Sequence, residues 1–181
     1  MYHICNNDTL RSIYFAYFQS VVSYAIILWG NSTYSRKIFT LQKKIIRIMM
    51  DAHRRTSCKM LFKKITDLNG PKPIYIYIYS LIRFLIGNQD KFLTNLSVHS
   101  INTRNEHHLH RPIANLSCFQ KGASYSGIRI FNNLPQSITN LWNEKPQFKV
   151  ALKNFLYAHC FYSVDEFFAC TDDMYCWLIW L

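Results

Sequence analysis

Residues that interrupt helices are scarce in this sequence, which has five glycines and five prolines among its 181 residues. A turn-rich β architecture needs more of both, so their scarcity favours long helices. Acidic residues are also few: 10 aspartates and glutamates face 21 lysines and arginines, and the formal net charge is +11. Half of the residues are apolar and 16% are aromatic, which argues against general disorder. We therefore expect a folded, mainly helical chain that meets a polyanion.

Several motifs of enzymes and secreted proteins are missing as well. The six cysteines form no Cys-x-x-Cys pair and no disulfide-framework spacing, so we interpret them as reduced thiols. No secretory leader is recognisable, and we expect an intracellular protein of the nucleus or cytoplasm that is not secreted. The sequence has neither a Gly-x-Ser-x-Gly elbow nor a glycine-rich phosphate loop. We expect no cofactor and no small-molecule substrate.

The most apolar stretch, residues 10–30, predicts one long helix that is apolar on nearly every side. Residues at alternating gaps of four and three mark one face, and a second apolar set lies opposite. The first set is Leu10, Tyr14, Tyr17, Val21, Tyr24 and Leu28, and the second is Phe15, Val22, Ile26 and Trp29. Such a helix must be covered by the rest of the chain, by a partner or by lipid. Its uncharged part, residues 13–29, is at the short end for a membrane span, so membrane residence is not expected.

A second helix is predicted over residues 35–52, and it is amphipathic. Its apolar side is expected to pack on the first helix and consists of Ile38, Leu41, Ile45, Ile48 and Ala52, broadened by Ile46 and Met49. Its basic residues fall within an arc of about 120° on the other side. They are Arg36, Lys37, Lys43, Lys44 and Arg47. The short turn at residues 30–32 makes an antiparallel hairpin the natural arrangement.

The remaining elements are predicted from periodicity and from glycine and proline positions. Residues 74–79 also fit a strand by composition, but their length and Pro73 favour a helix. Residues 88–120 are predicted to be a long polar surface connection. The predicted helices are 57 to 64 or 67, 73–87, 125–133 and 146–159, the last with Phe148, Leu152, Phe155 and Leu156 buried, and a short turn is predicted at 136–141. The fold class is a helical hairpin or bundle at 1–95, then a loop and a smaller helical unit at 96–168, and an apolar tail at 169–181.

The basic residues are unevenly placed, and this is the strongest functional pattern. Ten lysines and arginines lie between Arg36 and Lys64 and face one acidic residue, Asp51, so this segment carries +9. Cations along one helical arc can follow a phosphate backbone. The candidate nucleic-acid-binding residues are Arg36, Lys37, Lys43, Lys44, Arg47, Arg54 and Arg55, and the expected partner is the backbone of an RNA or DNA duplex. Tyr34 and Phe39 can stack on bases, although aromatic residues at helical spacing more often belong to a core.

Two other clusters are weaker. Asp172 and Asp173 are the only adjacent aspartates, but no flanking hairpin pattern surrounds them and no upstream motif supplies the third aspartate of a two-metal site, so we interpret them as an acidic tail. His107, His108 and His110 lie near Cys118, yet structural zinc usually needs two close ligand pairs. We therefore assign no catalytic residue and no metal site.

A series of short motifs occurs in one order along the chain, at residues 10–30, 38–47, 54–58, 99–104, 121–122, 127–135, 148–156 and 163–168. Together they resemble the region that follows the catalytic palm in insect non-LTR retrotransposon reverse transcriptases of the Jockey-like type. The resemblance covers residues 8–168, and Asp67 to Gly70 depart from it because a more apolar connection is expected there.

The resemblance implies a thumb-like fold that grips a primer–template duplex behind the palm. On this interpretation the chain is a truncated remnant of an RNA-directed DNA polymerase from a transposable element. A missing palm domain would be a further partner, and no polymerase activity is expected from this chain alone. The alternative is a small helical protein that binds another protein or a membrane and has no nucleic-acid role.

Overall fold

The computed structural model describes residues 6–58, 60–62, 73–100, 104–159, 161 and 163–170. These residues are mainly helical, as predicted, and they contain no β-strand, only one isolated bridge between Thr94 and Leu109. The chain divides into two compact units, Met1–Tyr77 and Ile78–Leu181. The division falls inside a helix, whereas the sequence placed its boundary within residues 88–120.

The first helical segment is bent and interrupted, so the prediction of one regular helix over 10–30 is wrong. It consists of α1 (Asn7–Ile13), a π-helical stretch η1 (Tyr14–Gln19), α2 (Ser20–Ser23) and α3 (Ile26–Trp29). The break lies at Ala25, whose φ of 50° is left-handed. The hydroxyl groups of Ser20 and Ser23 donate to carbonyl oxygens four residues earlier, which is a contact that bends helices. The Trp29 indole N–H donates to the Tyr24 carbonyl oxygen at 3.0 Å and so satisfies a group that the break releases.

One face of this segment is exposed, contrary to the expectation that little of it meets water. We name the large exposed side chains of this segment the apolar strip: Tyr17 (73% exposed), Val21 (72%) and Tyr24 (81%) lie before the break at Ala25, and Leu28 (74%) lies after it. Tyr14, Val22 and Ile26 are instead buried. The second helix of the hairpin and the segments after it cover one side of this segment. The described residues of unit 1 do not cover the apolar strip.

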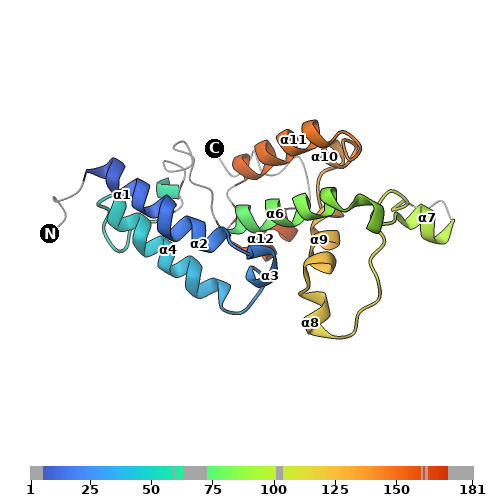
Figure 1. The fold of residues 1–181 in the computed structure, drawn as a ribbon, viewed down its shortest axis with the longest axis horizontal. Coiled ribbons are helices and arrows are strands. Elements are labelled where there is room, and N and C mark those ends of the chain that lie inside the picture. The colour runs from blue at the N-terminus through green and yellow to red at the C-terminus, as the bar shows by residue number, and fades with distance from the viewer. Residues whose placement is uncertain are drawn as a thin grey trace. The chain divides into compact units, whose positions relative to one another are not determined.

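Helix α4 (Ser35–Met49) forms the second arm of the hairpin and lies alongside α1 and α2 (Figure 1). The helix is where the sequence predicted it, but its packing face is rotated towards Gln42 and Ile46, so the predicted burial of Leu41 and Ile48 is wrong. Gln42 and Ile46 are fully buried, whereas Leu41 and Ile48 are about half exposed. Gln42 takes the central position because its amide N–H donates to the Tyr14 hydroxyl at 2.6 Å. Pattern reasoning on apolar residues alone misses a buried polar residue that has a partner.

Unit 1 is completed by a short segment after α4 and by the start of α6 (Pro73–Gly87). Cys58 and residues 60–62 are helical, and Phe62 is buried with its ring stacked on Phe39 at 5.8 Å between centroids. The predicted helix over 73–87 is confirmed, so the β-rich composition of 74–79 does not form a strand. The rest of the predicted helix after residue 62 lies outside the described residues.

Unit 2 packs its helices around the apolar face of α6. Ile78, Leu81, Ile82 and Leu85 are fully buried. Gly127 allows the helix over residues 123–131 to lie close to α6, because a Cβ at residue 127 would lie 3.2 Å from the Leu85 side chain. The other elements are η2 (Gln89–Lys91), α7 (Asn95–His99), α8 (Ser117–Gln120), α9 (Ala123–Phe131), α10 (Gln136–Thr139), α11 (Lys145–Ala158) and α12 (Val164–Ala169).

Helices α9 and α11 agree with the sequence-based predictions, and the short helix α10 lies where the sequence predicted a short turn. On α11, Phe148, Leu152 and Leu156 are buried as predicted, and Phe155 is half-buried. The ring of Phe148 stacks on Phe131 of α9 at 6.2 Å between centroids. The sequence predicted no helix at α12, which begins where the Ser163 hydroxyl accepts a hydrogen bond from the Glu166 amide at 3.0 Å.

Residues 93–100 and 104–110 are hydrogen-bonded to one another, whereas the sequence predicted a long polar connection here. The His110 amide donates to the Leu93 carbonyl at 2.8 Å, and the Asn95 amide donates to the His108 carbonyl at 2.9 Å, which closes the loop on itself. The loop is fastened to the end of α9 by Asn132. Its side chain accepts from the Leu109 amide and donates to the Leu109 carbonyl, both at 2.9 Å.

Candidate nucleic-acid interface

The predicted cations of α4 lie on the side of the helix away from its buried residues. We name the set Arg36, Lys37, Lys43, Lys44 and Arg47 the basic arc. Arg36, Lys37 and Lys44 are exposed, and Lys43 and Arg47 are half-buried at the edge of the packed side. At 100° per residue the five positions span about 120° of the helix circumference, and Gln42 and Ile46 lie outside that span. The arc is therefore one continuous cationic surface.

Aromatic rings border the basic arc at both of its edges. The Lys43 ammonium lies 4.3 Å from the centroid of the Phe39 ring, and the Lys37 ammonium lies 5.1 Å from that of Tyr34. Phe39 is half-buried and stacks on Phe62, so it belongs to the core and does not offer a stacking surface. Tyr34 is 66% exposed. Of the two aromatic candidates, only Tyr34 is placed to meet a base or sugar.

The two remaining candidates, Arg54 and Arg55, lie in a turn after α4. The helix ends where Asp51 adopts a left-handed φ of 46°, and the Ala52 amide donates to the Arg47 carbonyl at 2.8 Å. Residues 53–56, which we name the arginine turn, are closed by a hydrogen bond from the Thr56 amide to the His53 carbonyl at 2.9 Å. Both arginines are exposed.

Among the candidate nucleic-acid-binding residues, Arg47 has the environment least like that of an exposed surface cation. Its Nε–H donates to the carbonyl oxygen of Thr56 at 3.0 Å, in a partly buried contact. This bond joins the basic arc to the arginine turn. Residue spacing alone carries no sign of it, because the acceptor is a backbone atom.

The charge around these cations is almost entirely of one sign. Asp51 is the only acidic residue of the segment, and it is exposed. Within the described parts of the chain, none of Arg36, Lys44, Arg54 and Arg55 takes part in an ion pair. Their charge is thus available to an external anion.

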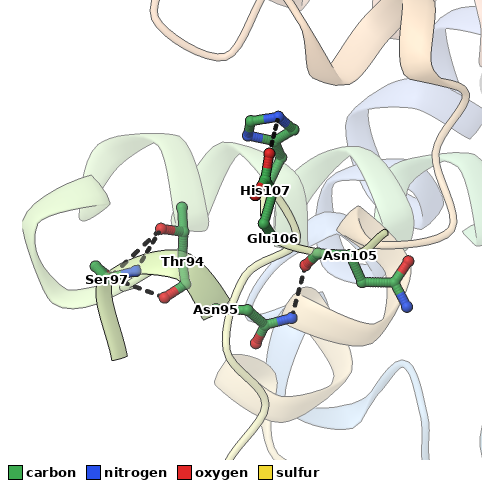
Figure 2. A network of polar contacts seen from close by, with 6 residues as sticks. All are labelled: Thr94, Asn95, Ser97, Asn105, Glu106 and His107. Carbon is green, nitrogen blue, oxygen red and sulfur yellow. Dashed lines mark hydrogen bonds and ion pairs between the residues drawn. The ribbon is translucent and has the colours of Figure 1, made fainter. Parts of the chain in front are cut away.

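The histidine cluster of unit 2 does not assemble into a metal site. His107 Nε2 lies 3.2 Å from the Glu106 carboxylate, and Figure 2 shows this pair beside the bond from the Asn95 side chain to the Asn105 carbonyl. The His99 and His110 rings meet at 5.1 Å between centroids. Burial and the neighbouring His107 lower the pKa of His108. Among the described residues, no three histidine, cysteine or acidic side chains converge as metal ligands.

Two further interpretations of the sequence concern the adjacent aspartates and a possible membrane span. Asp172 and Asp173 lie outside the described residues. None of the helices in the described ranges combines the length and the hydropathy that crossing a bilayer requires.

Comparison with known proteins identifies no relative: no family model, no curated protein and no solved structure matches the chain.

Proposed function

We propose that this protein binds the sugar-phosphate backbone of a nucleic-acid duplex through the basic arc and the arginine turn. The observation that carries the proposal is the set of exposed cations on one side of α4, Arg36, Lys37 and Lys44, which Arg54 and Arg55 continue in the arginine turn. Lysines and arginines arranged in this way neutralise successive phosphates and release their counterions. Such contacts position a duplex without reading its sequence.

The resemblance to Jockey-like reverse transcriptases gives this binding a context. We propose that residues 8–168 derive from the thumb and downstream part of such an RNA-directed DNA polymerase, where they would hold a primer–template duplex. The proposal covers binding and not nucleotidyl transfer.

The test is a titration of the full chain against a fluorescent 20-base-pair duplex over a salt series, with DNA and RNA–DNA hybrid duplexes in parallel. The logarithm of the binding constant K falls linearly as the logarithm of the salt concentration rises. Each lost phosphate contact lowers the magnitude of this slope by about 0.9. Replacing Arg36, Lys37 and Lys44 by Gln is therefore expected to lower the slope by about 2.7.

The matched control replaces Lys145, Lys149 and Lys153 of α11 by Gln, which removes the same charge from unit 2. The control is expected to keep the wild-type slope. Equal losses in both variants would mean that overall charge, and not the basic arc, drives binding. A wild-type chain whose binding does not respond to salt would reject the proposal.

The apolar strip supports a second candidate function, which is association with another protein or a membrane. Four large side chains of one helical segment are between 72% and 81% exposed. Exposed apolar groups that gather on one part of a surface favour an interaction site. Sedimentation of the free chain and flotation with vesicles test this candidate. Replacing Tyr17, Val21 and Leu28 by Ser should abolish any association and leave the helical circular dichroism unchanged. A wild-type chain that stays monomeric and lipid-free would reject it.

A further inference from the structure

The arginine turn is fastened to α4 at three places. Before the turn, the Ala52 amide bonds to the Arg47 carbonyl at 2.8 Å. At its end, the Arg47 Nε–H bonds to the Thr56 carbonyl at 3.0 Å. After it, the Cys58 thiol contacts the Lys43 carbonyl at 3.7 Å. The second and third of these contacts are made by side chains, and only the second is made by a side chain of α4.

Within the turn, backbone bonds hold the two exposed arginines in one geometry. The Thr56 amide bonds to the His53 carbonyl at 2.9 Å, and the Arg55 amide bonds to His53 Nδ1 at 3.3 Å. A flexible turn would lose conformational entropy each time its side chains met a phosphate. A turn that is already held avoids most of that cost.

We infer that Arg47 is a positioning residue, whose Nε–H holds the arginine turn so that Arg54 and Arg55 together meet adjacent phosphates of a duplex. The inference rests on the proposed function and changes the role that the sequence gave to Arg47, which was that of a phosphate ligand. Arg47 is half-buried and already bonded, whereas Arg54 and Arg55 are exposed and unopposed by an acidic partner in the described residues.

Two substitutions of equal charge separate the roles. In Arg47→Gln the amide nitrogen occupies the place of Nε along the side chain, so the donor to Thr56 is kept while the charge is lost. In Arg47→Met both the donor and the charge are lost. A phosphate ligand would suffer equally from either change, whereas a positioning residue would tolerate Gln and not Met.

Salt titrations of the full chain against the 20-base-pair duplex provide the measurement. Arg54→Gln/Arg55→Gln is expected to lower the slope by about 1.8, which corresponds to two phosphate contacts. Arg47→Met is expected to lower it by a similar amount, and Arg47→Gln to leave it near the wild-type value. Adding Arg47→Met to the double variant is expected to cause no further loss, because the arginines that it positions are already gone. Lys44→Gln is the control. It should lower the slope by about 0.9 both in the wild-type chain and in the Arg54→Gln/Arg55→Gln variant.

Equal losses of about 0.9 in Arg47→Gln and Arg47→Met would overturn the inference and make Arg47 a phosphate ligand. A wild-type slope in Arg47→Met would overturn it as well. The rate of tryptic cleavage after Arg54 and Arg55 is a second measurement that needs no nucleic acid. It therefore separates a failure of the positioning role of Arg47 from a failure of the proposed duplex binding. Faster cleavage in Arg47→Met than in Arg47→Gln supports the holding role even if no duplex binds, and equal rates in both contradict it.

Discussion

Tyr14 and Gln42 are 28 positions apart in the chain and share a buried hydrogen bond of 2.6 Å across the helical hairpin. The Tyr14 hydroxyl accepts from the Gln42 amide and donates to the Gln19 side-chain oxygen at 3.0 Å. Burial raises the pKa of Tyr14, and the hydrogen bond with Gln42 opposes that rise. The Gln42 side-chain oxygen is itself buried without a hydrogen-bond partner. This small network fixes which side of α4 faces the first segment.

Tyr14→Phe is expected to lower the free energy of unfolding by about 2–4 kcal/mol, because it leaves the Gln42 amide and the Gln19 oxygen buried without a partner. Urea unfolding followed by circular dichroism measures the loss. Tyr17→Phe is the control and should change stability by less than about 0.5 kcal/mol, since Tyr17 is exposed. Adding Gln42→Leu to Tyr14→Phe should restore at least about 1 kcal/mol, because it removes an unpaired amide. A double variant less stable than Tyr14→Phe would contradict this account.

Gly30→Ala is expected to destabilise unit 1 by about 1–3 kcal/mol through overpacking. A Cβ at Gly30 would overlap the buried ring of Tyr77 and lie 2.7 Å from the Ile26 carbonyl oxygen. Gly87 at the end of α6 offers the opposite case, since nothing lies within 4 Å of a Cβ there. Gly87→Ala should therefore raise stability by about 0.4–1 kcal/mol. Thermal unfolding of both variants tests the pair, and a stabilised Gly30→Ala would show that the ring does not lie on this glycine.

Asn132→Ala is expected to cost about 2–3 kcal/mol, because it breaks both hydrogen bonds to the backbone of Leu109, a residue that is 2% exposed. Amide hydrogen exchange should accelerate over residues 104–110 before the rest of unit 2 is affected. The adjacent Asn133 is exposed and bonds only to the Arg129 carbonyl within its own helix end, which makes it the control. Unchanged exchange in Asn132→Ala would show that the loop is held by other contacts.

His108 is expected to make stability pH-dependent in the mildly acidic range. Burial and His107 lower its pKa in the folded protein below the usual value of 6.5, so the unfolded chain binds a proton first as the pH falls. Stability is therefore fully present above about pH 6.5 and declines as the pH falls from there through the folded-state pKa. His108→Gln should flatten the curve of unfolding free energy between pH 7 and pH 5. An identical slope in wild type and variant would assign the dependence to another group.

The positions of most helices follow from local sequence. Pro73 at the start of α6, the scarcity of glycine and the periodic apolar residues of α11 act within a few turns of chain, so α4, α6, α9 and α11 agree with prediction. The cationic character of one side of α4 is local in the same sense. Its five basic residues lie on one arc in any regular helix over this segment.

The rotation of α4, the bend of the first segment and the role of Arg47 depend on residues that meet only after folding. Gln42 is buried because Tyr14 supplies a partner from another helix, and a hydrophobic period cannot anticipate that pairing. Arg47 bonds to a backbone oxygen nine residues away, which no side-chain pattern records. Local composition thus sets where helices and charges occur, whereas long-range hydrogen bonds and packing set which faces are covered, because their energies exist only when distant segments come together.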